Sequence, residues 1–203
     1  MEAVAEYRFH LPELWHQIPV GATDDAWAVE LAGGLLGDGE PPVPDAVTLL
    51  AQQFLDVSRA VAGMGVSTVQ AAVLVADPAS VLVDAMLTLS FQRGVPVETY
   101  QARLNSVVDE IEQAQIMGKQ DIQSEVPSGQ VHGAHLLIGH LPVEEFTAGS
   151  LLEERVQLGL FPHGTGDVVD LVVVAANTAF FEDLPTTALD LLGRVEIETE
   201  TVA

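Results

Sequence analysis

Histidines are the side chains of this 203-residue sequence that could most readily do acid–base or metal chemistry. Three of them, His132, His135 and His140, fall on one apolar stretch that alternation predicts to be a strand. Side chains at even spacing share a face of a strand, so His132 and His140 lie on one side and His135 on the other. At about 3.3 Å per residue, His132 and His140 are too far apart to ligate one ion directly. The spacing therefore predicts ordinary surface or partly buried histidines, and no metal site.

Other familiar catalytic patterns are missing from the sequence. It contains no cysteine, which excludes disulfides, thiolate nucleophiles and cysteine-based zinc or iron–sulfur sites. It contains no Gly-x-Ser-x-Gly, and Ser128-Gly129 and Gly149-Ser150 read as turns. The glycine-rich run 33–39 lacks the preceding strand and the lysine of a phosphate-binding loop. We therefore predict no catalytic residue and no bound cofactor.

The absence of a convergent catalytic set favours a non-enzymatic module that binds a protein partner, as an adaptor or a secretion or assembly chaperone, and that can form a homodimer. The rival hypothesis is a small-ligand-binding protein or an enzyme whose polar groups converge only in three dimensions. Its candidate members are His10, His16, His132 and His163, and a deep pocket holding two of them would favour it. A purely structural subunit is a third hypothesis.

The charge balance restricts the partners. Thirty acidic residues against seven basic ones give a net charge of -23. Such a surface repels phosphate backbones and anionic lipid headgroups, so we expect neither nucleic acid nor a membrane as partner. A protein partner with a basic surface would associate faster. The simpler interpretation, that the acidic residues only keep the protein in solution, remains open.

Several compositional features indicate the cellular setting. No stretch reaches the roughly twenty consecutive apolar residues that a membrane-spanning helix needs. The first residues are acidic where a secretory signal would carry Lys or Arg before an apolar run, so we expect a cytoplasmic protein. A single lysine, with much Ala, Val, Leu, Gly and Asp, resembles the residue usage of actinobacteria and other high-GC bacteria, or of a salt-adapted organism.

Periodicity predicts the elements that must position these side chains. Apolar residues at helical spacing predict four helices, over residues 24–35, 44–61, 97–114 and 180–192. Gly33 and Gly34 weaken the first of these, which we expect to be short. The Gly- and Pro-rich run 37–43 reads as a linker.

Alternation with turn signals predicts three hairpins. Their strands cover residues 69–76 with 81–91, 119–126 with 131–141, and 151–161 with 168–176. A further short strand is predicted over residues 7–11. The sequence therefore predicts one α+β domain over residues 1–203, with an antiparallel sheet of about six strands and helices packed on its faces. We expect a solvated tail from Glu196, disordered from about residue 199.

Two segments resemble the PsbP-like α/β/α sandwich superfamily. The first is Tyr7-Arg8-Phe9-His10 followed by Leu14-Trp15-His16-Gln17-Ile18-Pro19. The second starts near Leu151 and contains a Pro-His-Gly turn, the apolar strand 170–174 and the residues 179–184 that open the final helix. That superfamily includes an extrinsic photosystem subunit, a nuclear-import factor and many small bacterial proteins. The resemblance implies a non-catalytic module that docks on a partner, and it transfers no catalytic residue.

Overall fold

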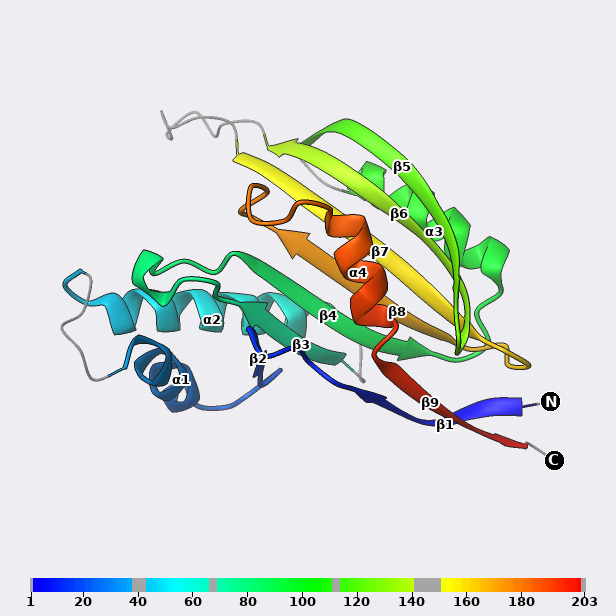
Figure 1. Ribbon diagram of the computed structural model, residues 1–203, viewed down its shortest axis with the longest axis horizontal. Helices are drawn as coiled ribbons and strands as arrows, with labels where there is room; N and C mark the ends of the chain where they lie inside the picture. Colours follow the sequence, from blue (N-terminus) through cyan, green and yellow to red (C-terminus); the bar gives the residue numbers. More distant parts are fainter. Residues whose placement is uncertain (1, 38–42, 66–68, 111–113, 141–150, 202–203) are drawn as a thin grey trace. The chain divides into compact units, whose positions relative to one another are not determined.

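The computed structural model describes residues 2–37, 43–65, 69–110, 114–140 and 151–201, and these residues form both helices and strands (Figure 1). The α+β class predicted from the sequence is confirmed. The elements in chain order are β1 (Glu2–Phe9), β2 (Trp15–Ile18), α1 (Ala26–Leu36), α2 (Ala46–Gly63), β3 (Val69–Leu74), the 3₁₀ turn η1 (Pro78–Ser80), β4 (Ala85–Gln92), α3 (Val97–Glu110), β5 (Ala114–Val126), β6 (Gly129–His140), β7 (Leu151–Pro162), β8 (Val168–Ala175), α4 (Leu184–Leu192) and β9 (Val195–Thr201).

The described strands form two sheets. The larger has seven strands in the order β2-β3-β4-β8-β7-β6-β5, and β1 pairs with β9 in a separate two-stranded ribbon. All three predicted hairpins are present as neighbouring strands, and the short β2 adds the strand beyond the expected six. After β4 the chain crosses through α3 to the sheet edge at β5 and returns strand by strand to β8.

The chain forms two compact units. One comprises residues 11–88, and the other comprises residues 1–10 and 89–203. Strand β4 contributes residues to both units. The division into two units does not test whether residues 1–203 fold as a single domain, so the single domain stays a prediction.

The unit of residues 11–88 buries the apolar stripe predicted for α2. Leu50, Phe54 and Val61 lie on this stripe and are at most 2% exposed. They form one core cluster with Ala28 and Ala32 of α1 and with buried side chains of β3. The apolar face of α2 is thus covered as its periodicity predicts.

Helix α1 passes through both of its glycines. We expected Gly33 and Gly34 to shorten or fray this helix, and the structure corrects that expectation, since both lie inside it. Packing explains the difference. Ala28 and Ala32 are buried, and the large apolar side chains of α1 pack against the same core cluster, which offsets the cost of about 1 kcal/mol per helical glycine.

In the larger unit, α4 and α3 lie on opposite faces of the strands β5–β8 (Figure 1). Helix α4 covers the apolar face: Leu184, Ala188 and Leu191 are buried in it against β7 and β8. Helix α3 lies over β6 and β7 on the other face, where it buries Tyr100 and Leu104. The two faces differ in chemistry, because the α3 side carries polar side chains between the helix and the sheet.

Several predicted boundaries were wrong. Helix α3 ends by Glu110, and Ala114, which we assigned to its apolar stripe, opens β5 instead. Helix α4 begins at Leu184 and not at Phe180, because Asp183 caps its first turn by accepting a hydrogen bond from the Thr186 N–H. Strand β4 begins at Ala85 and not at residue 81, because the side chain of Asp84 turns back to accept the Ala76 N–H.

The C-terminal segment is a strand and not a solvated tail. Residues 195–201 pair antiparallel with β1 along their whole length, from Val195 opposite Phe9 to Thr201 opposite Glu2. The alternation of Val195, Ile197 and Thr199 with three glutamates fits a strand with one apolar face, a pattern that we missed among so many acids. Most of the predicted linker, residues 38–42, lies outside the described residues, as do residues 202 and 203.

Candidate functional site

Strand β5 forms one end of the seven-stranded sheet. It is 13 residues long and pairs with β6 on one side, and no other strand of the described chain pairs with its outer edge. The opposite end of the sheet is β2, which has only four residues. A long free edge presents unpaired backbone N–H and C=O groups to which another chain can bind, whereas a very short edge strand presents few.

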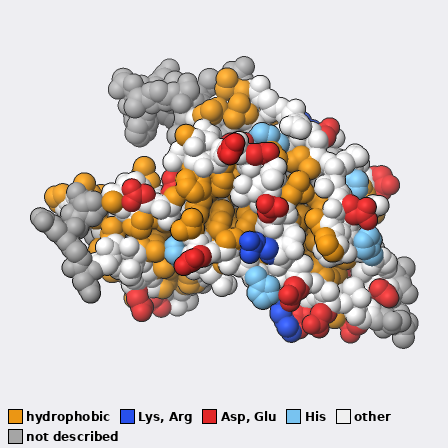
Figure 2. Space-filling view, viewed as in Figure 1, with side chains coloured by type: hydrophobic (Ala, Val, Ile, Leu, Met, Phe, Trp, Pro, Cys, Tyr) orange, Lys and Arg blue, Asp and Glu red, His pale blue; other side chains and the backbone are white. Residues whose placement is uncertain are grey.

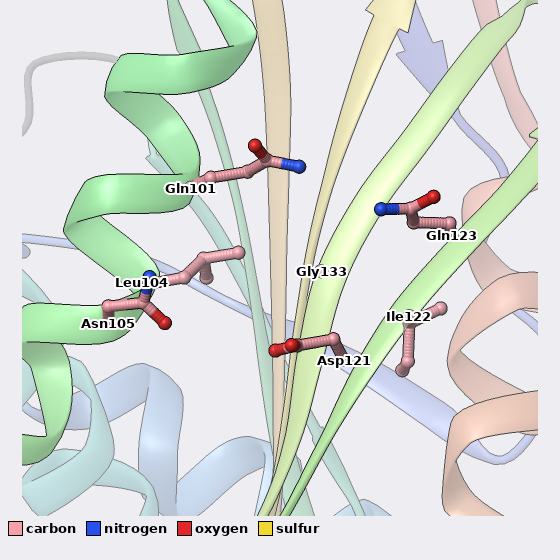
Figure 3. A pocket seen from close by; sticks show the side chains of 7 residues that line it. All are labelled: Gln101, Leu104, Asn105, Asp121, Ile122, Gln123 and Gly133. Atoms are coloured by element: carbon pink, nitrogen blue, oxygen red, sulfur yellow. The ribbon is translucent and has the colours of Figure 1, made fainter.

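A pocket of about 200 Å³ lies between α3 and β5. We call it the α3–β5 pocket, and it is lined by Gln101, Leu104, Asn105, Asp121, Ile122, Gln123 and Gly133. Figure 3 shows the amides of Gln101 and Gln123 directed toward each other from the helix and the strand. Lys119 donates a hydrogen bond to Asn105 Oδ1, and its Nζ lies 3.6 Å from Asp121 Oδ1. The pocket is therefore rich in amides and holds one carboxylate, which has a lysine as its counter-ion.

A second hollow flanks β5 on its other side. This α4–β5 groove is open, has a volume of about 470 Å³, and is lined by Ser124, Glu125, Val126, Leu189, Asp190, Gly193 and Arg194. It joins the end of β5 to the last turn of α4. One edge strand thus has a hollow toward each of the two helices.

A polar cluster anchors α3 to the sheet beside the α3–β5 pocket. The Tyr100 hydroxyl donates to Asp170 Oδ1 at 2.5 Å, and the Gln157 amide donates to both oxygens of Asp170 at 3.2 and 3.3 Å. Next to them, Gln101 Nε2 lies 3.3 Å from His132 Nδ1. Since each polar group in the cluster has a partner, its simplest role is structural.

The environment of this cluster shifts two pKa values. Burial raises the pKa of Asp170, and hydrogen bonds from Tyr100 and Gln157 oppose the shift. Burial, together with the negative charge of Asp170, raises the pKa of Tyr100 well above its usual value. Both shifts favour the neutral forms, so the pair has no feature that would make Tyr100 a base or nucleophile at neutral pH.

The structure does not gather the predicted histidines in either hollow. His10 is exposed and lies 3.5 Å from Glu196, while exposed His163 lies 4.0 Å from Glu125. Burial lowers the pKa of His16, which belongs to the other unit. His132 adjoins the α3–β5 pocket through its contact with Gln101, and His163 adjoins the α4–β5 groove through Glu125.

The remaining histidines lie on β6, where alternation predicts that His132 and His135 point to opposite faces of the sheet. His132 contacts α3, whereas His135 lies 2.7 Å from Glu154 and acts electrostatically on Asp183 at the start of α4. The two rings therefore point to opposite faces, as alternation predicts. The side chain of His140 and the residues Gly149-Ser150 lie outside the described part of the chain. Among the described residues, no three His, Asp or Glu side chains are arranged to hold a metal ion.

The sequence patterns considered above did not identify the lining of the α3–β5 pocket. Gln101 and Asn105 face the pocket from α3, and Asp121 and Gln123 face it from β5. Spacing of four on a helix and two on a strand would have placed each pair on one face. Nothing in the sequence indicated that these two faces meet, because that depends on the crossover of α3 to the sheet edge.

Among the charged side chains of the visible face, Asp and Glu prevail, and hydrophobic or uncharged areas lie between them (Figure 2). In Figure 2 many Asp and Glu side chains are exposed on the visible face, and few Lys or Arg interrupt them. Around the two hollows the charges are more balanced, since Lys119 and Arg194 lie beside Asp121, Glu125 and Asp190. Backbone binding at β5 is thus not opposed by a local excess of one charge.

Comparison with known proteins finds similar solved structures but no matching family model. No family model matches the chain, and no curated protein matches it. Among solved structures it is similar to LpqN, described as involved in cell envelope biogenesis of Mycobacterium tuberculosis, with 10% identity and a TM-score of 0.36 over 97% of this chain and 90% of that chain. A likeness at this level carries no argument about function. No described helix is long and apolar enough to cross a membrane.

Proposed function

We propose that the protein is a non-catalytic binding module that takes an extended segment of a protein partner along the outer edge of β5. The observation that carries this proposal is that β5, a 13-residue strand whose outer edge pairs with no other strand of the described chain, has a hollow on each side. Modules that add a strand to a sheet gain affinity from main-chain hydrogen bonds and specificity from pockets that take alternate side chains. Strand β5 offers both parts of this arrangement.

The partner is a foreign protein with a basic surface. Net charge of -23 attracts such a protein over a Debye length and repels a second copy of the same chain. An adaptor or an assembly or secretion chaperone would use this mode of binding. We place the protein in the cytoplasm, where disulfides are rare, because its sequence contains no cysteine. The resemblance of residues 7–19 and 151–184 to PsbP-like proteins remains a prediction, and it implies the same docking role.

The size of the α3–β5 pocket disfavours the rival hypothesis of a small-ligand site. Pockets for small molecules usually have volumes of about 300–1,000 Å³. The α3–β5 pocket is smaller, at about 200 Å³, and the α4–β5 groove is open to solvent. Two side chains of an extended segment suit these hollows better than one enclosed molecule.

Lys119 makes a direct test possible, because it is the only lysine of the chain and lies on β5. The protein is purified gently from its host at low salt, examined by native mass spectrometry, and treated with an amine-reactive cross-linker. We expect a discrete partner mass and a cross-link from Lys119 to that partner. The matched control is Lys119→Arg, which keeps the charge and should lose this cross-link.

Three outcomes would contradict the proposal. A cross-link between two copies of Lys119 would make the occupant a second copy. A bound small molecule or metal without a protein partner would favour the ligand-binding hypothesis and turn the search to the surroundings of His132. A partner complex in which Lys119 and Lys119→Arg give the same cross-links would move the docking site away from β5.

A further inference from the structure

We propose that the α3–β5 pocket receives the side chain of a glutamine or asparagine from the partner's extended segment. This inference rests on the strand addition proposed above and names what the pocket selects. It is argued from the chemistry of the lining, the charges beside it, its size and its position on β5.

The lining offers donors and acceptors in similar number. Gln101, Asn105 and Gln123 each carry a carbonyl oxygen that accepts and an NH₂ group that donates. No described residue bonds the amide of Gln123, and Gln101 uses only its nitrogen, toward His132. Figure 3 shows these two amides facing the same space. A guest amide, which also has both kinds of group, can satisfy them together, and an apolar guest would leave them unpaired.

The charges beside the pocket disfavour an ionised guest. Asp121 is the only ionisable side chain among the described lining residues, and Lys119 lies 3.6 Å from it. A Lys or Arg side chain would have to compete with Lys119 for Asp121 and would then leave Lys119 without its counter-ion. An Asp or Glu side chain would meet the like charge of Asp121. A neutral guest disturbs neither partner of this ion pair.

The volume of the pocket suits one side chain. At about 200 Å³ the pocket has room for one side chain and several waters. The carboxamide of Gln or Asn with its methylene stem occupies part of this space, and the remaining water can bridge to the lining. Leu104 supplies an apolar wall for the stem.

The position of the pocket sets the expected sequence pattern. Successive side chains of an extended segment point to opposite faces of the sheet, so every second residue points toward α3. One of these residues would enter the α3–β5 pocket, and its neighbours in the segment would lie on the side of the α4–β5 groove. The segment therefore carries Gln or Asn at one position of an alternating pattern.

The test uses a random-peptide display library as the probe against the full chain. Gln123→Leu removes a lining amide, and the matched control Gln120→Leu makes the same change on β5 outside the pocket. Both side chains are exposed, so both variants should fold, which circular dichroism checks. We expect wild-type protein and Gln120→Leu to select peptides with Gln or Asn at one alternating position, and Gln123→Leu to lose that preference.

Affinity measurements on one selected peptide sharpen the test. We expect Gln123→Leu to weaken its binding about tenfold, and replacement of the peptide's Gln by Leu to weaken binding to wild-type protein by a similar factor. Because both changes break the same contact, combining them should add little. Additive losses would overturn the assignment of that side chain to the pocket.

The remaining outcomes separate this inference from the proposed function. Peptides that protect the amides of residues 114–126 from hydrogen exchange, but show no preference for Gln or Asn, would overturn the side-chain assignment and leave strand addition standing. Peptides that protect other segments, or a library that yields no binder, would overturn both.

Discussion

The ring of Tyr100 fills the space that a side chain at Gly159 would occupy. A Cβ added at Gly159 would lie 2.6 Å from Tyr100 Cζ, closer than real contacts allow. The ring is 2% exposed and also packs edge-on against Phe161 at 5.6 Å between ring centroids, so it has little room to move. We therefore expect Gly159→Ala to lower the free energy of unfolding by about 1–3 kcal/mol.

Urea unfolding followed by circular dichroism checks this prediction. The matched control is Gly34→Ala, on the exposed side of α1, where nothing lies within 4 Å of the added Cβ. This second change should be neutral or should stabilise by about 0.5–1 kcal/mol, since alanine favours the helix. Equal effects of the two substitutions would contradict the packing described for Tyr100.

Asp170 should make stability depend on pH in the direction opposite to an ordinary carboxylate. Burial raises its pKa in the folded protein above the ordinary carboxyl value of 3.8. The folded state therefore binds the proton more tightly than the unfolded state, and this contribution to stability is complete below about pH 4 and is lost as the pH rises through the folded pKa. Asp170→Asn removes the titrating group, so the stability of the variant relative to wild type should improve from pH 4 to pH 7.

The control residue is Asp183, whose pKa is shifted in the opposite direction from that of Asp170. The pKa of Asp183 is lowered by its hydrogen bonds to Thr186, so its contribution is present above the usual carboxyl pKa and is lost as the pH falls. Asp183→Asn keeps a side chain that can cap α4. Denaturant titrations across this pH range should therefore give relative slopes of opposite sign for the two variants, and slopes of the same sign would refute the assignment for Asp170.

Among the elements of the larger unit, one carboxylate connects the β1–β9 ribbon to the segments that flank α3 and β8. Asp167 is buried and accepts the Val4 N–H at 2.9 Å and the Gly94 N–H at 3.2 Å. Asp167→Ala would leave both amides without this acceptor, at a cost of about 1–3 kcal/mol. We expect faster hydrogen exchange over Glu2–Phe9 and Val195–Thr201 in this variant.

Glu200→Ala serves as the control for the ribbon. It removes a charge from an exposed position on β9 and leaves Asp167 in place. Hydrogen exchange measured by mass spectrometry should leave the ribbon protected in this variant. If Asp167→Ala leaves the ribbon equally protected, pairing and apolar contacts such as that of Tyr7 with Phe91 hold the ribbon instead.

The helices and strands also show which parts of the fold can be predicted from the sequence. Periodicity predicted four helices and the three hairpins because each of these has an apolar face that repeats over several turns or residue pairs. It failed at boundaries, where single side chains such as Asp84 and Asp183 decide, and at β9, where acids hid the alternation. The α3–β5 pocket could not be predicted from the sequence. It depends on which strands α3 packs against after the chain crosses from β4 to the sheet edge.

At the scale of the molecule, the net charge of -23 should keep copies of the chain apart at low salt. Sedimentation velocity at ionic strengths of about 0.01 M and about 1 M, where the Debye length falls from about 30 to about 3 Å, measures this. We expect a monomer at low salt, and association with a basic partner that is faster at low salt than at high salt. A stable dimer at low salt would restore the homodimer hypothesis.

The two units can be followed separately during unfolding. Both tryptophans, Trp15 and Trp27, lie in the unit of residues 11–88, and both tyrosines, Tyr7 and Tyr100, lie in the other unit. The predicted single domain requires that tryptophan fluorescence and the near-ultraviolet signal of tyrosine change at the same urea concentration. Two separate transitions would show that the units are independent domains.

Hydrogen exchange on the complex with the protein partner tests strand addition most directly. Backbone amides on the outer edge of β5 should exchange freely in the isolated protein and become protected in the complex, because the partner's carbonyl groups accept them. The account predicts new protection concentrated in Ala114–Val126, with little change in β2 or in the β1–β9 ribbon. New protection confined to other elements, with β5 unchanged, would contradict it.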